Sequence, residues 1–261
     1  MELIHSLLTI KFIHMTSTSE TGHAKNVANF EKLIANITAL GTPYNPSKAS
    51  LKLPALNTQL TAAKTAITAV NSAEPAYKNA VSARDVAFAP LSKLITRVNN
   101  ALKASDTTTQ VDESALTLVR KLQGRRATPK MTEDEKKVAA EAGNEVTEIS
   151  SSQMSFDSRI DNFDKLIKLL TSVTAYAPNE ADLKVTALTT LLTDLKAKNT
   201  AVITAEAPLT NARIARNDVL YKSGTGVVDT SVDVKTYVKS VFGATSPQYK
   251  TISGLTFTNR K

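Results

Sequence analysis

The chain contains two copies of one sequence. Residues 44–84 align without a gap with residues 176–216, and 20 of the 41 paired positions are identical. Upstream, the string NFEKLI at residues 29–34 returns as NFDKLI at residues 162–167. An ungapped match of this length exceeds what a shared composition produces, so the two halves derive from a tandem duplication. The duplication predicts two units that share one fold.

The composition favours slender helical bundles for these units. Apolar residues form 42% of the 261 residues, but aromatic residues form only 5% and tryptophan is absent. Alanine and threonine fill much of the chain, and an alanine-rich core lets helices approach closely while burying little area per residue. The chain also has no cysteine, which excludes disulfides, thiolate catalysis and cysteine-bound zinc.

Apolar spacing predicts the helices of the first repeat. A stripe at intervals of three and four residues predicts a helix over 25–40, and Gly41 suits a left-handed position at its end. Ser47 can then cap a second helix, and residues 111–122 form a last one. The second helix has a heptad stripe typical of packing on a partner helix, made of Leu53, Leu56, Leu60, Ala63, Ile67 and Val70.

Pro75 leaves two interpretations of the segment that follows. Proline suits a first helical turn and is costly inside a helix, which predicts a hairpin and a third helix that ends near Ala104. The apolar stripe nevertheless continues in phase past Pro75, as it would in one long kinked helix. We favour the hairpin, because the second repeat has its proline at Pro208, one position beyond the counterpart of Pro75.

The second repeat predicts the same plan. Helices are expected over 158–173, 179–203 and 205–221, with a break over 222–226 and a further helix from Asp229 or Thr230 to Phe242. The tail after residue 246 is expected to be partly irregular. We therefore predict an all-α fold of two related bundles of three to four helices, over 25–123 and 158–261. A flexible charged linker would span 124–157, with a transient helix at 133–142.

Residues 1–24 are expected to be a disordered or non-native extension. The start is acidic, Lys11 interrupts the apolar run, and no small-residue cleavage site follows, so a secretory signal is not indicated. We expect translation to begin at Met15. The apolar run is shorter than the roughly 20 residues that cross a membrane. A cytoplasmic protein is the expectation, with export by a route that needs no signal left open.

Residue types restrict the chemistry that the two repeats can perform. All three histidines, His5, His14 and His23, precede the first repeat. Without histidine or cysteine the repeats lack Ser-His-Asp and Cys-His arrangements, and only oxygen ligands remain for a metal. The acidic pairs lie at expected helix starts or in the linker, where helix-dipole pairing explains them. We expect no enzyme activity, no cofactor and no metal.

Polar residues recur on the apolar stripe of both repeats. Glu74 and Arg84 return as Glu206 and Arg216. Polar residues on a core face usually fix the register of a bundle by pairing across it, so we expect buried register pairs here. A buried ligand site in each unit is the alternative.

Basic clusters end both repeats, and the chain has a net charge of +8. Such clusters can bind phosphate groups, although no aromatic residues for base stacking are interleaved, and a basic helix end is favoured by the helix dipole. The candidate phosphate contacts are Arg120, Lys121, Arg125, Arg126, Arg260 and Lys261.

Several strings also carry a resemblance: residues 21–30 (TGHAKNVANF), 44–50 (YNPSKAS), 211–217 (NARIARN) and 237–250 (YVKSVFGATSPQYK). Together they resemble a group of tandem-duplicated, all-helical proteins of Bacteroidota. The resemblance covers nearly everything after Met15 and implies a bacterial, all-helical protein. It implies no activity, cofactor or catalytic residue.

These observations predict a non-catalytic structural or protein-interaction protein whose helix faces bind a partner protein or another copy of the chain. The alternative is a basic protein that binds nucleic acid or the ribosome. A protein that acts at membranes is a weaker third option, because no sufficiently apolar helix hairpin supports it.

Overall fold

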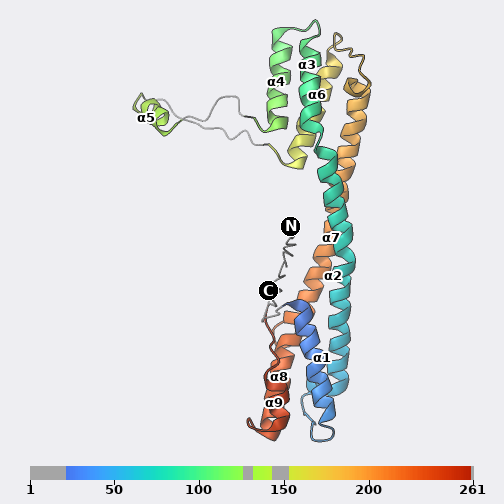
Figure 1. Ribbon diagram of the computed structural model, residues 1–261, viewed down its shortest axis with the longest axis vertical. Coiled ribbons are helices and arrows are strands. Elements are labelled where there is room, and N and C mark those ends of the chain that lie inside the picture. Colours follow the sequence, from blue (N-terminus) through green and yellow to red (C-terminus); the bar gives the residue numbers. More distant parts are fainter. Residues whose placement is uncertain (1–21, 126–131, 143–152, 260–261) are drawn as a thin grey trace, which may run out of the picture. The chain divides into compact units, whose positions relative to one another are not determined.

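The computed structural model describes residues 22–125, 132–142 and 153–259, and within these ranges the protein is all-helical with no strand (Figure 1). Two 3₁₀ turns precede the long helices: η1 (Ala49–Leu51) and η2 (Ala181–Leu183). The α-helices are α1 (His23–Ala39), α2 (Leu53–Phe88), α3 (Leu91–Lys103), α4 (Thr109–Gln123), α5 (Glu133–Glu141), α6 (Phe156–Ser172), α7 (Val185–Tyr221), α8 (Val227–Phe242) and α9 (Pro247–Ser253).

Most helix ends fall where the sequence predicts them, and the local chemistry explains why. Gly41 and Gly124 adopt left-handed backbone angles, φ 65° and 66°, just after α1 and α4. Thr108 caps α4 and Ser155 caps α6 by accepting backbone N–H bonds in the first turn. The short helix expected in the linker is α5, which begins with a capping box between Thr132 and Glu135.

The hairpins expected at Pro75 and Pro208 are wrong. Both prolines lie inside continuous helices, Pro75 in α2 and Pro208 in α7. A proline removes one backbone hydrogen bond and costs about 3 kcal/mol, whereas a helix break creates two new ends with up to four unsatisfied groups each. No glycine lies near either proline to support a turn. The in-phase apolar stripe was therefore the better guide.

The first repeat breaks instead at Ala89 and Pro90, which the sequence interpretation placed inside a helix that ended near Ala104. Helix α2 ends at Phe88, and α3 begins at Leu91 with Pro90 as its N-cap. Proline disfavours helical geometry in the residue before it, which accounts for the end of α2 at this point. In the tail, residues 247–253 form α9, and Ser246 caps it.

The described chain forms two compact units, and neither is a single repeat. Unit I contains residues 22–71 and 211–259, and unit II contains residues 72–125, 132–142 and 153–210. In unit I, α1 contacts α8 and α9; in unit II, α4 contacts α6, and α3 contacts η2. Each unit therefore combines the start of one repeat with the end of the other, and the compact units do not coincide with the expected segments 25–123 and 158–261.

The continuity of the long helices explains this exchange. Because α2 and α7 do not turn back at their prolines, each leaves the unit that contains its N-terminal part and ends in the other. Each unit has its own apolar core. Fully buried side chains in unit I include Phe30, Leu33, Ile37, Leu56, Leu220 and Val234, and those in unit II include Ile95, Leu102, Leu122, Phe163, Leu166 and Leu195.

One local contact is repeated in both units and fixes the turn before each long helix. The Tyr44 hydroxyl donates to the Leu51 carbonyl at 2.7 Å, and the Tyr176 hydroxyl donates to the Leu183 carbonyl at 2.8 Å. Burial raises the pKa of each tyrosine to about 12. The aligned repeats therefore keep the same buried hydrogen bond.

Candidate functional site

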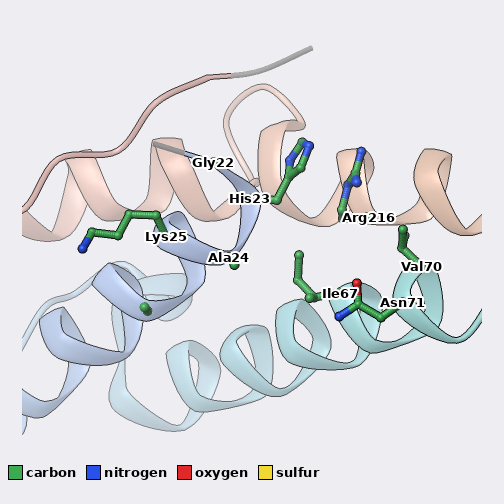
Figure 2. A pocket seen from close by; sticks show the side chains of 9 residues that line it. Gly22, His23, Ala24, Lys25, Ile67, Val70, Asn71 and Arg216 are labelled. Carbon is green, nitrogen blue, oxygen red and sulfur yellow. The ribbon is translucent and has the colours of Figure 1, made fainter. Parts of the chain in front are cut away.

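A cleft of about 600 Å³ opens in unit I between the first turn of α1 and the long helices. Figure 2 shows it from close by, with Ile67, Val70 and Asn71 on α2 and Arg216 on α7. The first turn of α1 supplies the remaining wall. We call this cavity the His23 cleft.

His23 is the first residue of α1 and belongs to unit I, although the sequence interpretation placed it in an extension outside both units. Its Nδ1 lies 2.6 Å from the hydroxyl of Tyr221, and the two rings are 5.6 Å apart between centroids. This contact joins the start of α1 to the end of α7. His5 and His14 lie outside the described residues.

Arg216 is the cationic side chain beside His23 in the cleft. Its Nε and Nη2 donate to the Asn217 Oδ1 at 3.1 and 2.8 Å. Burial lowers the pKa of Arg216, the nearby Tyr221 opposes that shift and Arg213 adds to it, but a guanidinium stays charged in proteins. In Figure 2 the side chains of His23 and Arg216 extend in the same direction, while Lys25 extends away from both.

Unit II holds a filled polar cluster around Arg84. The Arg84 guanidinium lies over the Phe156 ring, 3.8 Å from its centroid, and Nη1 donates to the Asn199 Oδ1 at 3.2 Å. Asn199 in turn donates from Nδ2 to the Asp157 Oδ1 at 2.8 Å. We call Arg84, Phe156, Asp157 and Asn199 the Arg84 cluster.

A second arginine completes the packing next to this cluster. Arg159 Nη2 donates to the Phe88 carbonyl at 3.2 Å, and its guanidinium lies 5.1 Å from the Phe88 ring centroid. Phe88 and Phe156 meet edge to face at 4.9 Å. Burial lowers the pKa of Arg159. The Nε atoms of Arg84 and Arg159 are buried without a hydrogen-bond partner in the described structure.

The expected register pairs take other partners. Glu74 forms an ion pair with Lys78 at 2.9 Å along α2, and Glu206 is exposed, so the expectation that Glu206 is buried is wrong. Arg84 and Arg216 bond to the asparagines described above instead. Sequence position alone placed all four residues on one stripe, but the stripe turns toward solvent at Glu206.

Half of the candidate phosphate contacts can be placed. Arg120, Lys121 and Arg125 lie at the end of α4 in unit II, whereas Arg126, Arg260 and Lys261 lie outside the described residues. Arg120 and Arg125 line one pocket of about 330 Å³ together with Gln123 and Asn99. Asn99 is 8% exposed, and its Oδ1 is buried without a partner in the described structure. We call this the basic pocket.

An apolar groove of about 620 Å³ lies elsewhere on unit I, along α2 and the end of α7. Every residue that lines it is a threonine or an alanine: Thr58, Thr61, Ala62, Thr65, Ala66, Ala69 and Ala215. The neighbouring Ile214 is 62% exposed. We call this surface the alanine groove; the sequence interpretation did not single it out, because small residues at these positions also fit a close helix contact.

The described residues offer neither a metal site nor a membrane span. These residues contain no group of three or more His, Cys, Asp or Glu side chains arranged to hold a metal ion. No helix in the described ranges is long and apolar enough to cross a membrane.

Comparison of the chain with protein-family models, curated proteins and solved structures finds no match. The resemblance to duplicated helical proteins of Bacteroidota therefore stays a prediction.

Proposed function

We propose that this duplicated, two-bundle helical protein is non-catalytic and acts by protein association in the cytoplasm. The observation that supports this function is the alanine groove of unit I, which is apolar and has a volume of about 620 Å³. The exposed Ile214 lies beside it in the sequence of α7. Small side chains let a second helix approach closely, and contiguous exposed apolar surface often marks a protein contact.

The occupant we propose for the groove is a second copy of the chain. Ile214 is 62% exposed and precedes Ala215, which lines the groove, so a protruding side chain lies one helix position from the recess. A two-fold contact pairs such a surface with itself, because each Ile214 can enter the groove of the other copy. The groove lining carries no charged side chain, so the proposed contact brings no like charges directly together although each chain has a net charge of +8.

Sedimentation of the full chain over a range of concentrations tests this function. We expect a dimer, and we expect Ala62→Arg to weaken it at least tenfold by placing a charge in the groove. Ile214→Ser should weaken it as well, through loss of the protruding side chain. Ala83→Arg, on an exposed part of α2 outside the groove, is the matched control. A chain that stays monomeric at high concentration would overturn the proposal, even if the groove captures another protein.

The second candidate function is nucleic-acid binding through the phosphate groups, and the basic pocket favours it. Arg120 and Arg125 line the same pocket, which places two cationic side chains of a type that contacts phosphates beside one cavity. The affinity for an RNA oligonucleotide should then fall steeply as the salt concentration rises. The double variant Arg120→Gln/Arg125→Gln should reduce the slope of log affinity against log salt concentration by about two. Lys93→Gln, an exposed change on α3 outside the pocket, should leave the slope unchanged. Binding that is absent, or equally salt-dependent in the double variant, rejects this candidate.

A further inference from the structure

The two repeats place an arginine at the same position and surround it differently. The ungapped alignment pairs Arg84 with Arg216 and Asn199 with Ile67. Helices α1 and α6 each have 17 residues and align from their first residues, which pairs His23 with Phe156 and Ala24 with Asp157. The His23 cleft in unit I is therefore the counterpart of the Arg84 cluster in unit II.

Unit II supplies its own carboxylate at this place, whereas the described residues that line the cleft in unit I supply none. The Arg84 guanidinium reaches the Asp157 carboxylate through Asn199, in a chain of bonds of 3.2 and 2.8 Å. In unit I the same two positions hold Ile67 and Ala24, and both line the cleft beside Arg216. Among the described residues, the lining includes His23, Lys25 and Arg216 but no Asp or Glu. The substitutions therefore open a cavity and remove the acid while they keep the arginine.

We propose that the His23 cleft binds a small organic carboxylate with an apolar body. The carboxylate supplies the negative charge that Asp157 supplies in unit II. Because Ile67 replaces the bridging asparagine, the carboxylate accepts hydrogen bonds directly from Arg216, whose Nε and Nη2 also donate to Asn217. The apolar body packs on Ile67, Val70 and Ala28. A volume of about 600 Å³ is in the usual range for small-molecule sites.

The lining favours a carboxylate over a phosphate. Arg216 offers one guanidinium that is partly used by Asn217, and Lys25 extends away from it in Figure 2. One partly engaged cation matches a single negative charge on the ligand. The apolar wall on α2 matches a hydrocarbon or ring, which inorganic phosphate lacks.

Calorimetric titration of the full chain tests this inference with a matched pair of probes. We expect 4-phenylbutyrate to bind and its neutral amide, 4-phenylbutanamide, to bind at least tenfold more weakly, because only the ionised acid forms an ion pair with the guanidinium. Arg216→Gln should weaken the acid by about tenfold or more. Arg84→Gln removes the equivalent charge in unit II and should leave binding unchanged.

Introducing an aspartate into the His23 cleft, at the position that matches Asp157, is a sharper test. Ala24→Asp with Ile67→Asn rebuilds the arrangement of unit II and should abolish binding of 4-phenylbutyrate while Arg216 remains. Ala24→Asp alone changes an exposed first-turn position, where an acid favours the helix, so it keeps the test valid if the double variant misfolds. Equal binding of acid and amide, or undiminished binding by Ala24→Asp, would overturn the proposal.

Discussion

Tyr44 and Tyr176 show how single residues were kept after duplication. Each hydroxyl donates to a carbonyl seven residues later, in the turn that precedes a long helix. The rings are only 7% and 6% exposed, so an ionised hydroxyl would lose both solvation and its donor role. Burial accordingly raises both pKa values to about 12 from the ordinary value near 10.

These shifts predict a loss of stability in alkaline solution. Because each folded-state pKa is raised, the contribution of the tyrosine is complete below about pH 10 and is lost as pH rises toward 12. Tyr44→Phe and Tyr176→Phe should each cost about 1 kcal/mol at pH 7 and flatten the alkaline decline. Urea unfolding at pH 8 and pH 11 measures both effects. Tyr77→Phe should keep the wild-type decline; an equal flattening there would contradict the assignment.

At the scale of elements, the long helices α2 and α7 tolerate prolines in their interiors. Val70 is buried before Pro75, and Phe88 is buried after it, so packing secures the helix on both sides. In α7, Val202 and Leu209 are buried on either side of Pro208. Tertiary packing therefore outweighs the local cost of each proline.

Replacing either proline with alanine should stabilise the protein. Pro75→Ala and Pro208→Ala each restore one backbone hydrogen bond, and we expect a gain of about 1–2 kcal/mol after the greater freedom of the unfolded chain is subtracted. Thermal unfolding monitored by circular dichroism measures the gain. Pro90→Ala, at a real helix start, should give little or no gain. Destabilisation by Pro75→Ala would instead indicate a helix break at this position.

The sequence predicted the positions of the helices better than it predicted which helices pack together. Apolar spacing located α1, α4, α6 and α8 to within a few residues, because one buried stripe per helix is a local signal. The apolar stripe did continue in phase through Pro75, but the sequence could not weigh that signal against the cost of the proline, since the balance depends on packing partners distant in the chain. The His23 cleft was missed for the same reason: His23 meets Tyr221 only after residues separated by 198 positions come together.

At the scale of the whole molecule, each compact unit is built from segments of both repeats. Unit I needs α1 from the first repeat and α8 from the second, and unit II needs α4 from the first and α6 from the second. The alternative of two independent bundles would keep each repeat's contacts within its own half. The exchange predicts that the two repeats stay associated in the folded protein.

Cleavage between the repeats tests this exchange directly. A protease site inserted within residues 126–131 divides the chain without cutting any described helix. We expect both fragments to elute together in size-exclusion chromatography and to separate only in denaturant. An uncut chain that carries the same insertion is the control. Fragments that separate under native conditions would restore the model of two independent bundles.

The exchange of segments also determines how the protein reaches its native state. The partners of α1 lie about two hundred residues away, so their encounter requires closure of a very long loop. Covalent linkage nevertheless makes that encounter a first-order event, whose rate does not depend on how much protein the cell contains. A polypeptide with a single copy would have to collide with another molecule to complete the same core.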